Sequence, residues 1–496
     1  MKTEKMSAVL YKYIRVVVCA ASVVCFIISH IVQNIDLMLI SVVILFVANV
    51  LYGLEKFYER FVFTVFNTAC MFFLFGRNVI ELISGENWAR RFSYEINSKI
   101  CTIIFISLLS MFFGALLAGG VPCKQKNKEK RIKDAFITSE DYNKNLQIVS
   151  LVMFLASISF TFVVELEKLL STRGQEYAAY YLNFQTSLPS FFLSISALSK
   201  FCLCLFLITN PPKKTAFPIL GLYVVSNLPS FAAGQRNHFL SAALLAVCYY
   251  VIRDYCGKKS DKKWLGKFEI SAVVICIPFL LAFLSMYESI RLGKSVGEVN
   301  IGKSILKLFS SQGVTYDVMG QGIMLKDELP QTNFNYTFGP IIEYFRGNSV
   351  SSFLFGTTSY PKASAELATY GNSLADSLAY MVLGEKYLNG AGLGSSFMLE
   401  NYIDFGYIGV VLFSMALGFL LIAMMKYYGR NKIISFFSLV ALLQMFMLPR
   451  APATGWVVLL LYIPMYFLVL VVITVTGLTL KKYYQKSKGA QKCFRK

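Results

Sequence analysis

Long runs of apolar residues, separated by short polar stretches, recur along almost the whole chain. The runs are continuous rather than alternating, which favours helices over strands, and about 20 apolar residues in a helix cross a bilayer. Only helices and closed barrels satisfy their backbone polar groups in lipid. The pattern predicts an all-α, polytopic transmembrane helical bundle of about twelve spans, at approximately 14–31, 35–52, 61–83, 100–122, 146–165, 188–209, 216–232, 237–253, 268–287, 402–425, 433–449 and 454–478.

One connection is much longer than the others. It covers residues 288–401 and contains short pieces with an apolar helical face, which are expected to lie flat at the membrane interface: Ile301, Ile305, Leu308 and Phe309 in one piece, and Ile341, Ile342 and Phe345 in another. We expect four parts: transmembrane helices 1–9 with short loops in 1–287, a large external loop in 288–401, helices 10–12 in 402–480, and a basic cytoplasmic tail in 481–496.

The positive charge of the chain is concentrated in alternate connections between the apolar runs. Hydrophobic residues make up 56% of the chain and charged residues 15%, where a soluble domain carries about 25% charged residues. The net charge of +20 lies in alternate connections, namely 124–133, 213–214, 253–267, 426–432 and the tail. Basic connections face the cytoplasm. This topology places both termini in the cytoplasm of a multi-pass inner membrane protein, and it accounts for the basic charge without nucleic-acid binding.

Cysteine and histidine give no sign of a disulfide or metal framework. The eleven cysteines lie mostly inside apolar runs without CxxC spacing, so we expect free thiols. Two histidines exclude a His-rich metal site. The first apolar run follows a basic flank with no cleavage site, which indicates an uncleaved first helix.

Arg236 is the first candidate for chemistry. It stands in Gly234-Gln235-Arg236-Asn237, at the expected external start of the eighth span. A charge so close to the hydrocarbon is costly without a function or a partner, and a guanidinium binds phosphate through two hydrogen bonds. The alternative is that Arg236 reaches the lipid headgroups.

Three other arginines lie at the same expected level of the membrane. Arg291 follows the ninth span and alternatively pairs with Glu288 one helical turn away. Arg346 ends an amphipathic piece and alternatively is a solvated charge. Arg450 stands in a Pro-Arg-Ala-Pro turn and alternatively is a topological flank.

A glycine-rich segment precedes the tenth span. It runs through Gly392, Gly394 and Ser395 to Glu400 and Tyr402. Glycines allow a ligand to approach the backbone, and Glu400 could orient a hydroxyl or act as a base. Alternatively, the segment is a tight cap, and Gly406 and Gly409 serve helix packing. Lys200, Glu165 and Arg77 lie in or near spans, where pairing among the three is the simple interpretation.

Segment 372–418 resembles the late-helix motif of Wzy-type O-antigen and capsular polysaccharide polymerases. The matching residues are Asn372-Ser373-Leu374, Gly392-Leu393-Gly394-Ser395-Ser396, Glu400, Asp404-Phe405-Gly406 and Gly409, and Gly234-Gln235-Arg236 resembles the family's Gly-x-Arg. The large loop before the glycine-rich motif also matches. The resemblance implies the GT-C-like architecture shared by these polymerases and the related ligases. Such ligases place a histidine near the position of Glu400. This chain has no histidine there, which favours a polymerase.

The resemblance also implies a reaction. The enzyme would transfer the growing glycan from undecaprenyl diphosphate onto the next lipid-linked repeat unit, at the outer face of the cytoplasmic membrane. It would use neither a nucleotide sugar nor a metal or other cofactor. Its partners would be undecaprenyl-diphosphate-linked oligosaccharides, the bilayer, a chain-length regulator and a flippase, and no nucleic acid.

Roles for the candidates follow from this chemistry. Negative charge develops on the diphosphate leaving group, which arginines stabilise, and a carboxylate can polarise the attacking hydroxyl. The expected catalytic residues are therefore Arg236, Arg291 and Glu400. The expected substrate-binding residues are Gln235, Asn237, Arg346, Gly392, Gly394, Ser395, Tyr402 and Arg450.

Three other functions remain open. A lipid-linked oligosaccharide flippase has a similar span count, but this chain shows no similar halves and has a long external loop. A polyprenyl-phosphate-sugar glycosyltransferase carries an acidic residue in a long first external loop, whereas the connection at 33–36 is short. The third is a lipid-linked polysaccharide ligase.

Overall fold

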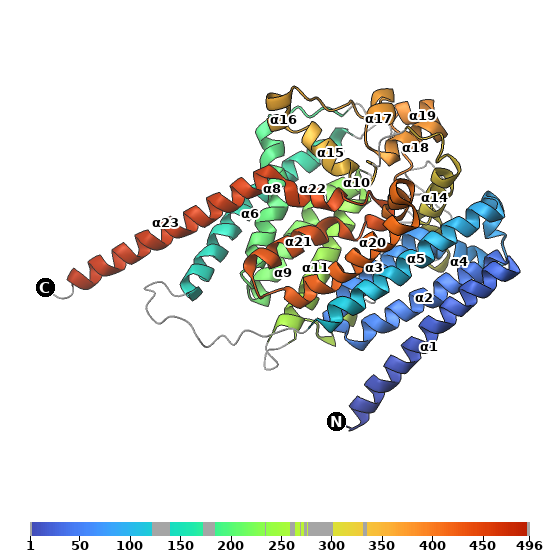
Figure 1. Ribbon diagram of the computed structural model, residues 1–496. Coiled ribbons are helices and arrows are strands. Elements are labelled where there is room, and N and C mark those ends of the chain that lie inside the picture. Colours follow the sequence, from blue (N-terminus) through green and yellow to red (C-terminus); the bar gives the residue numbers. More distant parts are fainter. Residues whose placement is uncertain are drawn as a thin grey trace. The chain divides into compact units, whose positions relative to one another are not determined.

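The computed structural model (Figure 1) describes residues 2–121, 139–171, 184–233, 235–257, 263–267, 269–271, 275, 301–330 and 335–493. Within these ranges the chain forms helices and no strands, which confirms the predicted all-α class. Ten of the described helical segments are long and apolar enough to cross a membrane: Tyr11–Val32, Ile35–Glu55, Phe57–Ile83, Tyr94–Gly120, Glu140–Ser171, Ser190–Leu207, Lys213–Ala232, Arg236–Cys256, Phe397–Tyr427 and Ile463–Tyr483.

Three predicted spans need comment. The span at 268–287 lies almost entirely outside the described residues. The span at 433–449 is the 14-residue helix α21 (Lys432–Met445), followed by a 3-10 turn at Leu448–Arg450. The span at 454–478 is divided into α22 (Gly455–Leu461) and α23 (Ile463–Cys493). Pro464, in the first turn of α23, explains this break, because it has no N–H to donate to the carbonyl of Leu460 four residues earlier and its ring clashes with that carbonyl.

The chain divides into two compact units. Unit 1 contains residues 1–121, 250–426 and 444–458, and unit 2 contains residues 122–249, 427–443 and 459–496. The N-terminal helices of unit 1 are α1 (Lys2–Val32), α2 (Ile35–Glu55), α3 (Phe57–Cys70), a π-helical turn (Met71–Phe75), α4 (Gly76–Ile83), a 3-10 turn (Trp88–Arg91) and α5 (Tyr94–Gly120).

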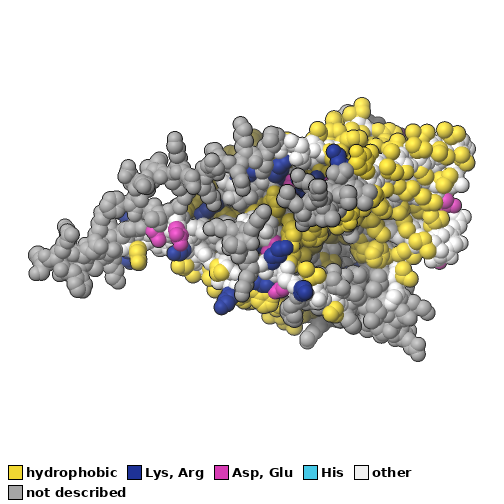
Figure 2. All heavy atoms as spheres, turned by 90° about the horizontal axis from the view of Figure 1, so that it is seen from below, with side chains coloured by type: hydrophobic (Ala, Val, Ile, Leu, Met, Phe, Trp, Pro, Cys, Tyr) yellow, Lys and Arg dark blue, Asp and Glu magenta, His cyan; other side chains and the backbone are white. Residues whose placement is uncertain are grey.

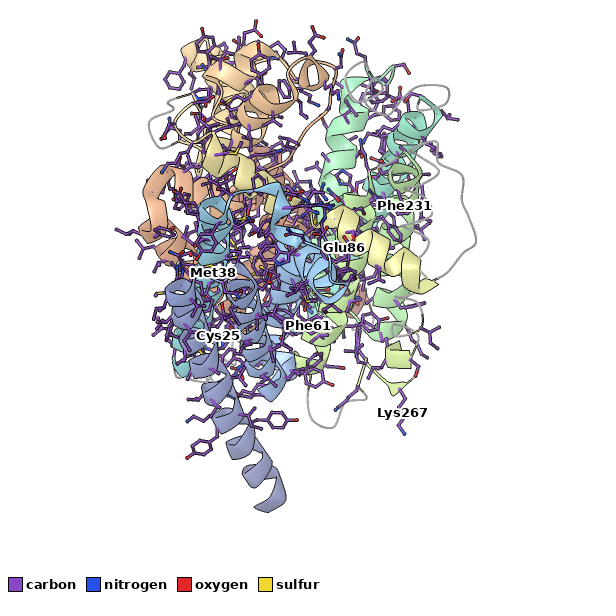
Figure 3. The ribbon with its side chains drawn as sticks, turned by 90° about the vertical axis from the view of Figure 1, so that its right-hand side faces the viewer. Cys25, Met38, Phe61, Glu86, Phe231 and Lys267 are labelled. Atoms are coloured by element: carbon purple, nitrogen blue, oxygen red, sulfur yellow. The ribbon has the colours of Figure 1, made fainter. Side chains whose placement is uncertain are left out.

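The N-terminal helices of unit 1 pack side by side around α2. Helix α2 contacts α1, α3 and α5, and Met38 of α2 and Phe61 of α3 are both buried (Figure 3). A buried amide pair also fixes the packing, because Asn49 Nδ2 donates to Asn67 Oδ1 at 2.9 Å. The outward side of α1 is apolar, with exposed valines and isoleucines, and Figure 2 shows a broad hydrophobic area in the view from below. Such a surface suits contact with lipid.

The long connection of unit 1 is itself helical. Its described helices are α13 (Ile301–Gln312), α14 (Thr315–Met324), α15 (Gly339–Arg346), α16 (Ser349–Phe355), α17 (Ala365–Tyr370), α18 (Leu374–Leu383) and α19 (Glu385–Leu388). Helices α13 and α15 coincide with the two amphipathic pieces predicted from the sequence. Helices α16 to α19 lie at one end of unit 1, at the top of Figure 1.

Helix α20 (Phe397–Tyr427) returns from this connection through the bundle and packs tightly on α5. A Cβ on Gly114 of α5 would lie 1.9 Å from the carbonyl oxygen of Met415. A Cβ on Gly418 would lie 2.1 Å from the carbonyl oxygen of Met111. The two backbones therefore approach as small residues allow in membrane helices, and the hydroxyls of Ser107 and Ser414 bond across the contact at 2.8 Å.

Unit 2 is built around the contact of α6 (Ser139–Ser171) with α8 (Ser190–Leu207). It also contains α9 (Lys213–Ser226), α10 (Leu228–Ala232), most of α11 (Arg236–Cys256) and α23. Hydroxyls join the first pair, since Thr161 Oγ1 bonds Ser199 Oγ at 3.1 Å. Asn145 Nδ2 donates to the carbonyl of Thr476 at 2.8 Å and ties α6 to α23.

Candidate functional site

Three connections that are far apart in sequence meet at one end of unit 1. The first connection contributes Asp36, whose Oδ1 accepts the indole N–H of Trp88 at 2.8 Å. Trp88 belongs to the connection before α5, as does Arg91. Arg91 in turn faces Asp317 of α14, with 3.8 Å between its Nη1 and the carboxylate Oδ1. The long connection is therefore fixed against the short connections at this end of the unit.

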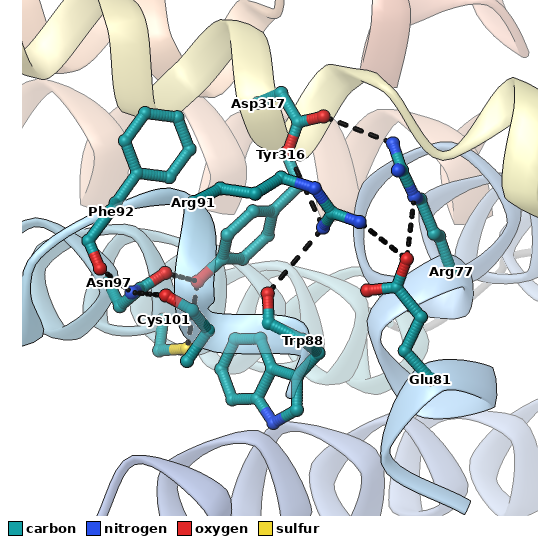
Figure 4. Close-up of polar contacts among 10 residues, drawn as sticks. Arg77, Glu81, Trp88, Arg91, Phe92, Asn97, Cys101, Tyr316 and Asp317 are labelled. Carbon is teal, nitrogen blue, oxygen red and sulfur yellow. Dashed lines mark hydrogen bonds and ion pairs between the residues drawn. The ribbon is translucent and has the colours of Figure 1, made fainter. Parts of the chain in front are cut away.

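Four charged side chains form the centre of this contact (Figure 4). Arg77 donates through Nε to Glu81 Oε1 and through Nη1 to Asp317 Oδ2, both at 3.0 Å. Arg91 Nη2 also donates to Glu81 Oε1. All four side chains are at most 24% exposed. Two arginines and two carboxylates balance in charge, so this cluster joins α4 and α14 rather than offering free positive charge to a diphosphate.

The partial burial of this cluster changes the acidity of one member. Burial raises the pKa of the Asp317 carboxyl, and Arg91 and Arg77 oppose this effect. The neighbouring Tyr316 is buried and donates to Asn97 Oδ1 at 3.0 Å. Asn97 Nδ2 donates in turn to the carbonyl oxygens of Ala89 and Phe92 at 2.9 and 2.8 Å. This chain of hydrogen bonds fixes the connection before α5 beneath α14.

The glycine-rich segment brings Glu400 to the same unit. Glu400 lies in the first turn of α20 and is 1% exposed. Its Oε1 accepts the hydroxyl of Ser395 at 2.7 Å, and its Oε2 accepts the backbone N–H of Ala453 at 2.7 Å. Gly394 adopts a φ of +84°, which turns the chain before the helix. The carboxylate thus joins the glycine-rich segment to the turn after Arg450.

Asp404 and Gly406 shape the next turn of α20. Asp404 Oδ2 accepts the backbone N–H of Thr337 at 2.6 Å, and Thr454 Oγ1 donates to the carbonyl of Thr337 at 2.8 Å. Gly406 has φ 63° and ψ −154°, a conformation outside the helix that essentially only glycine adopts. Apart from its own stretch of chain, no described residue has an atom within 4 Å of a Cβ built on Gly406. The interpretation of Gly406 as a packing glycine is therefore wrong, and it marks a break in α20.

Glu400 borders a cavity of about 290 Å³. The long connection supplies most of the wall: Gly339, Pro340, Glu343, Ser359, Tyr360, Leu367, Asn372, Ser373 and Asp376. Glu400 and Pro452 supply the rest. The cavity therefore lies where α15, α18, the start of α20 and the turn after Arg450 come together.

The carboxylates in the cavity wall are held by their own partners. Glu343 Oε1 accepts both the backbone N–H and the Nδ2 of Asn372 at 2.9 Å. Asp376 Oδ1 accepts the hydroxyl of Tyr387 at 3.0 Å, and its Oδ2 accepts the hydroxyl of Ser373. These contacts fix the position of both carboxylates before any substrate arrives.

The predicted binding residues are found in several places. The Arg346 guanidinium lies over the ring of Tyr360, 4.2 Å from its centroid. Arg450 donates to Gln312 Oε1 at 2.8 Å. Tyr402 lies beside the ring of Tyr407 and under Lys326, whose Nζ is 5.0 Å from the Tyr402 centroid. Gly392 is exposed, whereas Ser395 is buried beside Glu400.

The other predicted residues are not in the described part of unit 1. Gln235, Arg236 and Asn237 stand at the start of α11 in unit 2, where Arg236 is half-buried and Asn237 is exposed. Arg291 lies outside the described residues, as does Gly234. The idea that Arg236, Arg291 and Glu400 share one cavity remains a prediction.

The described contacts of Lys200, Glu165 and Arg77 differ from the expected pairing among these three residues. Arg77 pairs with Glu81 and Asp317. In unit 2, Glu165 pairs with Lys168 at 2.7 Å and accepts the hydroxyl of Ser230. Lys200 Nζ instead lies 5.3 Å from the ring centroid of Phe201.

Sequence reasoning did not select Glu343, Tyr360 or Asp376. Asp376 follows the Asn372-Ser373-Leu374 motif and could have been found as an acidic residue in the first turn of a helix capped by Ser373. Glu343 and Tyr360 have no comparable local signal. Their importance depends on a tertiary contact with Asn372 and with the cavity.

A family model described as O-antigen polysaccharide polymerase Wzy matches residues 14–483. The chain belongs to this family. The match covers nearly the whole chain, including the four-charge cluster, the cavity and the start of α11. The protein is therefore a multi-pass membrane protein and a polysaccharide polymerase of the glycosyltransferase type. Neither a curated protein nor a solved structure matches the chain.

Proposed function

We propose that the polymerase transfers a growing glycan from polyprenyl diphosphate onto the next lipid-linked repeat unit, at the outer face of the bacterial cytoplasmic membrane. A hydroxyl oxygen of the acceptor sugar attacks the anomeric carbon of the donor. The bond between that carbon and the diphosphate oxygen breaks, and the diphosphate leaves with the electron pair. Each cycle forms one glycosidic bond and releases one polyprenyl diphosphate and one proton.

The observation that carries the proposal is the position of Glu400. Its carboxylate is fixed by Ser395 and Ala453 and forms part of the cavity wall. Each carboxylate oxygen has a second lone pair, so Glu400 can accept a hydrogen bond from the attacking hydroxyl and then its proton. A base contributes about 10²–10⁴-fold to such a step.

Arg236 and Arg291 are proposed to stabilise the leaving diphosphate. Each is expected at the external end of a span, at the level where a lipid-bound diphosphate lies. A preorganised donor to a developing charge contributes about 2.7–4 kcal/mol. The balanced pairing of Arg77 and Arg91 with carboxylates supports this assignment, because it leaves the diphosphate to other arginines.

The contacts at one end of unit 1 support the assignment of the reaction to the outer face of the membrane. Asp36, Trp88, Arg91 and Asp317 come from three connections that the charge pattern predicts to be external, and they contact one another. At the other end of α5, Lys426 Nζ donates to the carbonyls of Ala118 and Val121 at 2.8 and 2.6 Å. Lys426 opens a connection that the same pattern predicts to be cytoplasmic.

The proposal is tested in a strain from which the polymerase has been deleted. The surface polysaccharide should appear on a gel as a single repeat unit, and the wild-type chain should restore a ladder. Loss of every repeat unit would indicate a flippase. Intact polymer that accumulates on the lipid without transfer would indicate a ligase.

A further inference from the structure

We propose that the cavity beside Glu400 is the subsite for the acceptor saccharide, and that Glu343 and Tyr360 are its binding residues. This inference rests on the polymerase function proposed above. It assigns the acceptor's terminal sugar to the part of the long connection that lines this cavity.

The charge of the cavity wall favours an uncharged ligand over an anionic one. Glu343, Asp376 and Glu400 all border the cavity, and none of its lining residues is Lys, Arg or His. A diphosphate in this cavity would meet like charge on several sides, which is strongly unfavourable. Sugar hydroxyls are uncharged donors, and hydrogen bonds from neutral donors to carboxylates are among the strong ones.

The same carboxylates are not arranged as a cation site. Among the described residues, no group of three or more His, Cys, Asp or Glu side chains has the geometry to hold a metal ion. Asp376 is already bound by Ser373 and Tyr387, and Glu400 by Ser395 and Ala453. Acceptors that are spread around a wall suit a ligand with several hydroxyls.

Glu343 has an acceptor oxygen to spare. Both hydrogen bonds from Asn372 go to its Oε1, and within the described chain no donor reaches Oε2. An acceptor atom held beside a cavity and lacking a donor is ready to bind a ligand hydroxyl. The bonds from Asn372 keep the Glu343 carboxylate in place while the ligand exchanges.

Tyr360 supplies an aromatic part of the wall. The Arg346 guanidinium lies 4.2 Å from the ring centroid, within cation–π range. Through this contact Arg346 holds the Tyr360 ring in position. Aromatic side chains with a few placed polar groups are the usual lining of small-molecule sites.

The size of the cavity limits the ligand. Its volume of about 290 Å³ lies just below the usual range of ligand pockets, about 300–1,000 Å³. It therefore takes the terminal part of an acceptor rather than a long glycan. Because Glu400 borders the same cavity, a saccharide bound there presents a hydroxyl to the proposed base.

The test measures binding rather than polymerisation. The probe is an oligosaccharide of one repeat unit, obtained by partial hydrolysis of the producing cell's surface polysaccharide. Saturation-transfer NMR follows its binding to the full chain in nanodiscs. Glu343→Gln keeps the Oε1 acceptor for Asn372 and converts only the spare oxygen into an N–H donor. We expect this variant and Tyr360→Ala to weaken binding at least about tenfold, with Tyr360→Phe close to wild type.

Glu366→Gln is the matched control, because Glu366 is exposed in the first turn of α17 on the same connection. It should bind the probe as the wild type does, and pyrophosphate should not compete. Unchanged binding by Glu343→Gln and Tyr360→Ala, or displacement by pyrophosphate, would overturn the subsite. Neither result touches the polymerase function, which the deletion strain tests separately.

Discussion

The carboxylate of Glu400 accepts the backbone N–H of Ala453 at 2.7 Å, although the two residues are 53 positions apart. This bond joins the first turn of α20 to the turn after Arg450, and the hydroxyl of Ser395 binds the other carboxylate oxygen. One buried side chain therefore holds three chain segments at the cavity, and its removal should affect both stability and activity.

Two substitutions separate these roles of Glu400. Glu400→Ala leaves the buried N–H of Ala453 and the hydroxyl of Ser395 without their partner, which costs about 1–3 kcal/mol per buried group. Glu400→Gln can still accept from Ala453 and donate to Ser395 Oγ, so it should unfold near the wild-type temperature. Because an amide cannot take a proton from the acceptor, the Gln variant should give no polysaccharide ladder. A normal ladder from a well-folded Gln variant would reduce Glu400 to a structural residue.

Because α20 is broken at Gly406, we expect the stability of the protein to be unusually sensitive to substitution of this residue. Its φ of 63° with ψ of −154° strains any other residue, so Gly406→Ala should destabilise the protein by about 1–3 kcal/mol. The measurement is thermal unfolding in detergent. Gly477→Ala on α23 is the control, since no described residue outside its own stretch of helix comes within 4 Å of its Cβ position and its φ is not positive. Equal unfolding temperatures for the two variants would contradict the assigned conformation.

Arg236 is expected to act on the diphosphate. Arg236→Ala should abolish the ladder at normal membrane levels, because one lost donor costs about a hundred- to thousandfold in rate. Arg236→Lys should restore it only in part, since an ammonium cannot bind two phosphate oxygens at once. Arg90→Ala, at an exposed arginine of unit 1, is the control. If lysine replaces Arg236 fully and alanine is tolerated, the side chain is a headgroup anchor.

Asp317 predicts a dependence of stability on pH. Burial raises the pKa of its carboxyl above the ordinary aspartate value of about 3.9. The folded state therefore keeps a proton that the unfolded chain has released, and stability falls as pH rises between the two pKa values. The unfolding temperature of the wild type relative to Asp317→Asn should decrease as pH rises above about 4. A constant or increasing difference would show that Arg77 and Arg91 outweigh burial.

The sequence predicted the fold better than the site, for a physical reason. Long apolar runs have few alternatives to membrane helices. Helices α13 and α15 also lie where the spacing of apolar residues predicts a helix with one apolar face. Contacts between residues that are far apart in the sequence could not be predicted, because they produce no local sequence pattern. Arg77 and Asp317 are 240 positions apart, and the carboxylate of Glu343 reaches Asn372 from a separate helix. Gly406 looked like a packing glycine because a positive φ cannot be seen in a run of apolar residues.

The family motif located Glu400 but not its surroundings. The glycines and Ser395 next to it were visible in the sequence, and Ser395 does contact the carboxylate. The second partner, the N–H of Ala453, is a backbone group that any residue except proline supplies. For that reason only the structure could show how Glu400 is held.

The most direct measurement of the proposed polymerase function is polymerisation by the purified chain in liposomes that contain only lipid-linked repeat units. We predict a ladder of lipid-linked glycans, with one polyprenyl diphosphate released for each new glycosidic bond, and neither product from Glu400→Gln. Absence of polymer from the wild-type chain, or equal polymer from both proteins, would contradict it.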